Sequence, residues 1–121
     1  MNVKKRVELL APAGSPEALV AAVESGANAV YLGLKQFNAR GNAVNFSHKD
    51  LGLYVPFAHS RGTRVYLTLN TLVKMDEMWP ILESLRYASD CGIDGVILPD
   101  LGLSRMIAKY FPHLRRHAST Q

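Results

Sequence analysis

The chain has 121 residues, of which 48% are hydrophobic and 20% charged, as in an ordinary soluble globular domain. Its net charge of +4 permits nucleic-acid binding without arguing for it, because the basic residues are scattered apart from Lys4-Lys5-Arg6 and Arg115-Arg116. No apolar run approaches the ~20 residues that cross a membrane, residues 7–12 do not resemble a signal peptide, and the single cysteine, Cys91, fits a reducing compartment. We expect a cytoplasmic protein with no membrane partner.

One turn from helix to strand recurs along the sequence. Residues 26–33 and 92–99 align without a gap, GANAVYLG on GIDGVILP, and residues 62–68, GTRVYLT, have the same form. The three leading glycines lie 36 and 30 residues apart, about the length of a strand plus its crossover helix. This repeat predicts parallel strands with helices packed outside them.

The first repeat begins with an apolar strand over residues 7–11, which Pro12 breaks. Ser15 and Pro16 are typical of a helix start, and Gly26 is typical of a helix end. A second strand over 29–34 precedes a polar loop over 35–46. The next helix is predicted to open with a capping box at residues 47–50 and to kink or restart late at Pro56.

The later repeats follow the same plan. A third strand is predicted over 64–70, a helix from about Asp76 or Pro80, and a fourth strand over 94–98. The spacing of Leu103, Met106, Ile107 and Tyr110 predicts a helix that buries all four side chains. A fifth strand is predicted over 116–121.

We therefore expect an α/β fold of parallel βα units from a TIM-type barrel, with about four units and the start of a fifth strand. A complete eight-fold barrel takes about 250 residues, so residues 1–121 are predicted to form a single N-terminal partial-barrel domain. A half-barrel exposes two sheet edges, which predicts a homodimer closing an eight-stranded ring.

Active sites of parallel barrels lie at the carboxyl ends of the strands. Polar side chains follow those ends here, and we take six of them as candidate substrate-binding residues: Asn38, Arg40, Asn70, Asp100, His117 and Gln121. No catalytic residue can be assigned among them.

For two of these candidates, a role in binding substrate can be weighed against a purely structural role. Arg40, on the longest loop, has a guanidinium suited to a carboxylate or phosphate, or else it pairs with a loop carbonyl. Asn70 shares a strand face with Tyr66 and Thr68 that should point into the barrel. It would touch substrate there or satisfy an internal hydrogen bond.

The sequence gives little support for a hydrolase triad or for a metal-binding site. His117, Ser119 and Asp100 could form a triad, but no nucleophile elbow or oxyanion glycines flank Ser119. His113 and His117 are four residues apart, but Pro112 argues against a shared helical face, and no other metal-ligand spacing occurs. We interpret Cys91 as a small, buried hydrophobic residue rather than a nucleophile. We identify no metal site and no cofactor site.

Several blocks together resemble one family. They are ELLAPAGSPE at residues 8–17, GANAVYLG at 26–33, FNAR at 37–40, LTLNT at 67–71 and HASTQ at 117–121. In this order they resemble the opening of the collagenase-like peptidase family, also called peptidase family U32. The resemblance covers essentially the whole chain.

The resemblance implies a barrel longer than this chain. It implies either a peptidase, in some members linked to collagen degradation, or a hydroxylation protein acting on tRNA uridine, ribosomal RNA cytidine or a ubiquinone precursor. Prephenate is implied as a co-substrate, and an iron-sulfur cluster is implied with its cysteine ligands downstream of residue 121.

Three functions follow from these observations. The parent protein hydroxylates an RNA pyrimidine in a prephenate-dependent reaction, it is a peptidase, or the chain is an inactive half-barrel that acts only in assembly. The expected partners are correspondingly RNA, a peptide or a second copy.

Overall fold

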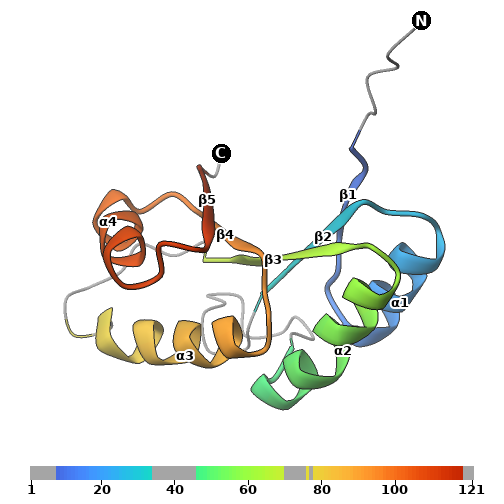
Figure 1. Cartoon of the computed structure of the whole chain (residues 1–121), viewed down its shortest axis with the longest axis horizontal. Helices are drawn as coiled ribbons and strands as arrows, with labels where there is room; N and C mark the ends of the chain where they lie inside the picture. Colours follow the sequence, from blue (N-terminus) through green and yellow to red (C-terminus); the bar gives the residue numbers. More distant parts are fainter. Residues whose placement is uncertain (1–7, 34–45, 70–75, 77, 119–121) are drawn as a thin grey trace, which may run out of the picture.

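The computed structural model describes residues 8–33, 46–69, 76 and 78–118. In this part of the chain strands and helices alternate, in the order β1 (Leu10–Pro12), α1 (Pro16–Glu24), β2 (Ala29–Leu32), α2 (His48–Ser60), β3 (Arg64–Thr68), α3 (Met78–Asp90), β4 (Gly95–Leu98), α4 (Leu101–Tyr110) and β5 (Arg115–Ala118). The strands form one parallel sheet in sequence order, with α1, α2 and α3 along one side of it (Figure 1). The predicted α/β arrangement of four βα units and a fifth strand is confirmed.

The recurring glycines end three helices in the same way. Gly26, Gly62 and Gly92 have φ of 91°, 77° and 99°, a backbone conformation that favours glycine. After α1 the N–H of Gly26 donates to the Val23 carbonyl and the next N–H reaches the carbonyl five residues back, and α2 and α3 repeat both bonds. These paired bonds satisfy carbonyls that a helix end leaves without partners.

The helix starts follow from local side chains. Ser15 caps α1 by accepting from the Ala18 N–H at 3.1 Å. Ser47 and Asp50 form a reciprocal capping box on α2, each side chain accepting from the other's backbone N–H. Such caps typically contribute about 1 kcal/mol each to stability. Both caps were predicted from the sequence.

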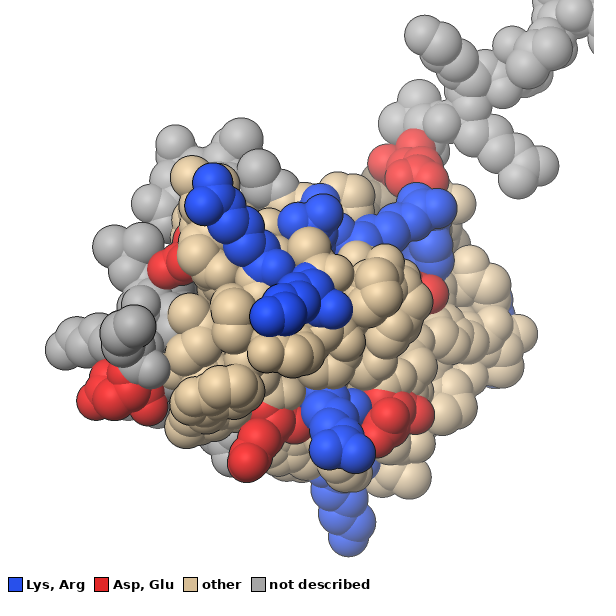
Figure 2. Space-filling model, turned by 60° about the vertical axis from the view of Figure 1, so that its left-hand side comes forward, with Lys and Arg blue, Asp and Glu red and all other residues tan. Residues whose placement is uncertain are grey.

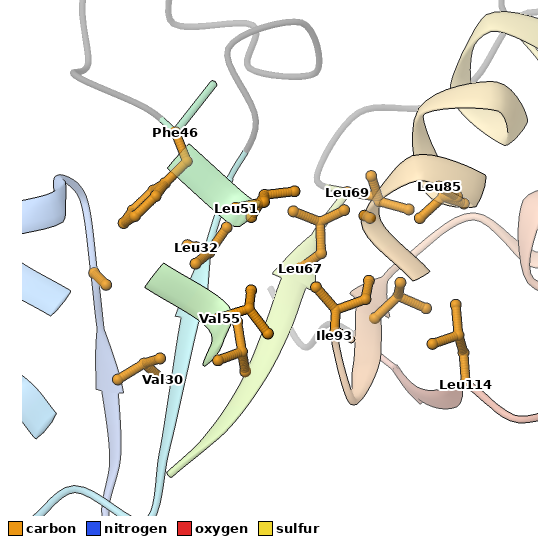
Figure 3. Close-up of a cluster of buried hydrophobic side chains, with 14 of the residues drawn as sticks. Val30, Leu32, Phe46, Leu51, Val55, Leu67, Leu69, Leu85, Ile93 and Leu114 are labelled. Atoms are coloured by element: carbon orange, nitrogen blue, oxygen red, sulfur yellow. The ribbon is translucent and has the colours of Figure 1, made fainter. Parts of the chain in front are cut away.

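The register of the sheet assigns each strand residue to one of two faces, because paired residues of parallel strands point the same way and alternate residues point oppositely. Val30 pairs with Val65, and Leu67 with both Leu32 and Val96. All five are buried, so this face meets the helices. Figure 3 shows the resulting core, in which Leu51 and Val55 of α2 lie against Leu32 and Leu67.

The opposite face of the sheet is the inner face of the partial barrel. It carries the alternate positions, including Tyr31 and Tyr66, which pair with each other, and Thr68 and Ile97, which do likewise. The Thr68 hydroxyl donates to the Leu32 carbonyl at 3.1 Å. The predicted inward face of the third strand is therefore present at Tyr66 and Thr68.

Several predicted boundaries differ. The first strand runs over Leu10–Pro12 and includes Pro12, because an edge strand tolerates a residue without an N–H. The helix containing Pro56 begins at His48 with no late restart, and Pro56 lies on its exposed side. The last helix buries Leu103 and Ile107 as predicted, but Tyr110 is 47% exposed.

The other boundaries shift by a few residues. The third helix begins at Met78, between the two predicted starts, and the fifth strand begins one residue early, at Arg115. The loop predicted over 35–46 lies outside the described residues except for Phe46, which is buried. Within the described ranges, the helices are too short and too polar to cross a membrane.

Candidate functional site

Asp100 lies at the carboxyl end of the fourth strand, where β4 turns into α4. Its Oδ1 accepts from the Leu103 N–H at 2.8 Å and its carbonyl accepts from the Ser104 N–H at 3.0 Å, so it is the N-cap of α4. The strand end and the helix cap together fix the position of this carboxylate beside the sheet.

Arg116 and His117 of β5 point to opposite sides of the sheet. Arg116 pairs with Val96, on the helix side, and its Nη1 donates to the Ser104 hydroxyl at 3.2 Å and to the Ser104 carbonyl at 3.3 Å. His117 pairs with Ile97, on the inner face. The two side chains therefore approach the carboxyl end of β4 from both faces.

A glycine makes room for the contact of His117 with β3. The rings of Tyr66 and His117 meet edge to face, with centroids 5.1 Å apart and planes at 84°, a favourable arrangement for aromatic rings. Between these strands lies Gly95, where an added Cβ would come within 2.6 Å of the Arg115 carbonyl oxygen and 3.0 Å of Tyr66 Cδ1. Only glycine allows the neighbouring strands to hold this geometry.

Asp100, Arg116 and His117 border a small cavity of about 260 Å³. It is lined by Leu98, Pro99, Asp100, Leu101, Ser104, Arg116 and His117. A carboxylate, a guanidinium and an imidazole on one cavity are suited to binding a small polar or anionic group. The structure thus brings together two of the predicted site residues, Asp100 and His117, and adds Arg116 and Ser104.

Sequence reasoning missed Arg116 as a site residue because its neighbours depend on the register of β5. The Arg115-Arg116 pair alone is typical of a solvated strand entrance. The other predicted site residues, Asn38, Arg40, Asn70 and Gln121, lie outside the described part of the chain, as does Ser119 of the possible triad. Their roles stay predictions.

Three further polar contacts lie at the opposite, amino ends of the strands. Glu8 pairs with Arg64 at the start of β3, and His59 Nε2 lies 2.8 Å from Asp94 Oδ2, just before β4. Asp94 also accepts from the Val65 N–H at 2.7 Å. The amino ends of the strands in a parallel barrel contribute to stability rather than to catalysis, so we assign these groups a structural role.

A serine and a histidine also meet at that end. Ser89 Oγ lies 2.6 Å from His113 Nε2, which is within reach for a nucleophile and its base. In the described part of the chain, however, no acidic side chain pairs with His113. The contact ties the end of α3 to the loop that enters β5.

A larger hollow, of about 750 Å³, lies between α2 and α3. Its lining is His48, Lys49, Gly52, Leu53, Pro80, Glu83, Ser84 and Tyr87. It is a groove on the outer helix layer, away from the inner face of the sheet. We therefore place the candidate site at the carboxyl ends of β4 and β5.

Cys91 lies half-buried at the end of α3. Partial burial raises the pKa of its thiol, and a hydrogen bond with Tyr87 opposes that shift. A protonated thiol is a weak nucleophile, as expected for a structural cysteine. Among the described residues no three His, Cys, Asp or Glu side chains are grouped to hold a metal ion.

Comparison with known proteins gives a consistent result. The family model described as peptidase family U32 matches residues 14–121. An uncharacterized protease of Methanocaldococcus jannaschii is 40% identical over 115 residues, covering 95% of this chain and 28% of that protein. The 23S rRNA 5-hydroxycytidine C2501 synthase of Escherichia coli is 40% identical over 116 residues, covering 96% of this chain and 17% of its own length.

The fold has a solved counterpart. The structure of a U32 peptidase superposes with a TM-score of 0.74 at 17% identity, covering 98% of this chain and 51% of that one. The chain therefore spans less than a third of the two curated relatives and about half of the solved one.

Proposed function

Because this chain belongs to peptidase family U32, we propose that the protein acts in the cytoplasm in the hydroxylation of an RNA pyrimidine. Its described residues would form the first part of the barrel, and the cavity at Asp100 and His117 would be part of the substrate site.

The observation that carries the proposal is the similarity to a ribosomal RNA hydroxycytidine synthase, 40% identical over 96% of this chain. The cavity supports it, since Arg116 and His117 offer hydrogen-bond donors to a polar or anionic ligand. Arg40 is proposed as a further anion-binding residue, so Arg40→Ala should weaken ligand binding more than Arg40→Lys does.

Hydroxylation of a pyrimidine is an oxidation and needs an oxygen donor that is itself reduced. Prephenate is the proposed co-substrate. An iron-sulfur cluster does not fit this chain, because clusters are held by several cysteine thiolates and the sequence has Cys91 alone. We derive no step through a cluster from these residues.

A peptidase is the second candidate, supported by the equal identity to an uncharacterized protease. The described residues supply no nucleophile, base and acid in contact at the carboxyl ends of the strands. A protein acting only through assembly is the third candidate, and the two edges of the sheet support it.

The test compares RNA from cells that lack the gene with RNA from cells complemented by the complete protein, using nucleoside mass spectrometry. We expect one pyrimidine to lose 16 Da in the deletion strain and to regain it on complementation. Unchanged nucleosides together with cleavage of gelatin by the purified protein would favour the peptidase. Unchanged nucleosides without cleavage would favour the assembly role.

A further inference from the structure

The net charge of the protein comes from one part of the chain. Residues 1–100 contain ten basic and ten acidic side chains, whereas residues 101–121 contain four basic and no acidic ones. The whole formal charge of +4 therefore belongs to Arg105 and Lys109 of α4 and Arg115 and Arg116 of β5. Figure 2, in which the side of the molecule with α4 comes forward, shows Lys and Arg side chains gathered over the upper part of this face.

Three of these basic side chains are arranged around the solvent side of α4. Arg105 and Lys109 are exposed and one helical turn apart, pointing away from the buried Leu103 and Ile107. Arg116 is anchored to Ser104 by its two hydrogen bonds, next to Arg105. Phosphates are the ligands that guanidinium and ammonium groups bind best in such arrays.

Two aromatic rings continue this surface toward α3. Trp79 is 63% and Tyr110 47% exposed, and their centroids lie 6.4 Å apart with planes at 54°. Lys109 Nζ lies 5.4 Å from the centre of the Tyr110 ring. Two large exposed rings on neighbouring helices are unusual on a solvated surface, and beside basic groups they are typical of a stacking platform for unpaired bases.

Each of these groups either belongs to α4 or contacts a residue of α4. From Ser104, which anchors Arg116, to Tyr110, which contacts Trp79, is six residues, or about 9 Å along the helix axis. Around that axis the order is Arg116, Arg105, Lys109, then Tyr110 with Trp79. Arg105 and Lys109 thus lie on the solvent side of α4, with Arg116 on one flank and the aromatic pair on the other.

We propose that this face of α4 binds single-stranded RNA, with phosphates on Arg105, Lys109 and Arg116 and one base stacked on the Trp79–Tyr110 pair. That the nucleic acid is RNA rests on the proposed function, whereas the charges and rings alone specify a single-stranded nucleic acid. The surface lies on the outer side of α4 and adjoins the cavity at Asp100 and His117 through Arg116, which lines both.

The charge part is tested by the salt dependence of binding to a fluorescent 20-nucleotide RNA. Each phosphate contact on a single strand contributes about −0.7 to the slope of log K against log salt concentration. Arg105→Gln with Lys109→Gln should therefore flatten the slope by about 1.4. The matched control, Lys49→Gln with Arg86→Gln, removes two exposed charges from α2 and α3 and should leave the slope unchanged.

The stacking part is tested through Trp79, the sole tryptophan of the sequence. Single-stranded RNA should quench its fluorescence, and duplex RNA of the same length should bind without quenching. Tyr110→Ala should weaken binding roughly 5- to 150-fold, the range for the loss of one stacked base, with the slope unchanged. Circular dichroism checks that each variant is folded.

Equal slopes for the two double variants would overturn the proposal, as would binding to phosphatidylserine vesicles but not to RNA. Absence of quenching would overturn the stacking. If the deletion strain shows no loss of hydroxylation but the two double variants still differ in slope, the proposed function is wrong and the α4 surface still binds nucleic acid. If hydroxylation is confirmed but the two double variants have equal slopes, only the inference about α4 is overturned and the proposed function stands.

Discussion

The ring of His117 meets the ring of Tyr66 edge to face across β4, with the two centroids 5.1 Å apart. The strand between them carries Gly95, whose missing side chain leaves space for the ring of Tyr66 on one side and for Arg115 of β5 on the other. The aromatic pair of the inner face therefore depends on a residue that contributes no side chain of its own.

Gly95→Ala should destabilise the protein. The added Cβ would lie 2.6 Å from a backbone oxygen of Arg115, which can move only if β5 moves, and such overpacking typically costs about 1–3 kcal/mol. The measurement is the free energy of unfolding in urea. Gly52→Ala is the matched control, since its Cβ would meet only Tyr87 Oη at 4.0 Å and alanine suits a helix interior better by about 1 kcal/mol. Equal stability of the Gly95→Ala variant and the wild type would contradict the close approach.

Substitutions of Asp100 separate its two roles. Asp100→Ala should lower the free energy of unfolding by about 1 kcal/mol, because the Leu103 N–H loses its cap. Asp100→Asn keeps a capping oxygen and should leave stability nearly unchanged, since asparagine is an equally good N-cap. If the carboxylate serves the substrate, hydroxylation falls in both variants. Full activity in the stable Asp100→Asn variant would show that Asp100 is only a cap.

Features set by neighbouring residues in the chain were predictable from the sequence. Ser15, the Ser47–Asp50 box and the glycines that end α1, α2 and α3 act within one turn of their own helix. A local pattern is enough to place them, and the repeat of the glycines is enough to give the parallel fold.

Features set by the register between strands were not predictable. Arg116 reaches Ser104 because it pairs with Val96, and Gly95 is needed because Tyr66 and Arg115 flank it. Tyr110 was expected inside from its spacing to Leu103 and Ile107, but it lies at the last turn of α4 and meets the exposed Trp79 instead. No single segment of sequence contains these relationships.

The reactivity of Cys91 should depend on pH in a way that reports its environment. Burial raises the pKa of the thiol above the ordinary value of about 8.5, so the rate of alkylation by iodoacetamide should reach half its maximum at a higher pH in the folded protein than in urea. Because the pKa is raised on folding, this group's contribution to stability is complete below pH ~8.5 and is lost as the pH rises through the folded pKa. Cys91→Ala should remove the part of the loss of stability at alkaline pH that comes from this thiol. Identical alkylation profiles in the folded and unfolded protein would contradict the assignment.

The edges of the sheet predict self-association of the 121-residue chain. In the described residues β1 and β5 each pair with one neighbour only, and Leu9 and Leu10 at the β1 edge are 54% and 49% exposed. Each chain supplies five strands, so two copies would bring ten strands rather than an eight-stranded ring.

The predicted dimer can be measured by light scattering across a range of concentrations. A charge on an edge strand opposes pairing with another chain, and covering one leucine is worth about 1.5–3 kcal/mol. Leu10→Lys should therefore raise the dimer dissociation constant at least tenfold. Leu53→Lys is the control, because Leu53 is 61% exposed on α2, which packs on the central strand β3, and it should leave the constant unchanged. A wild-type chain that stays monomeric at high concentration would rule out pairing through these edges.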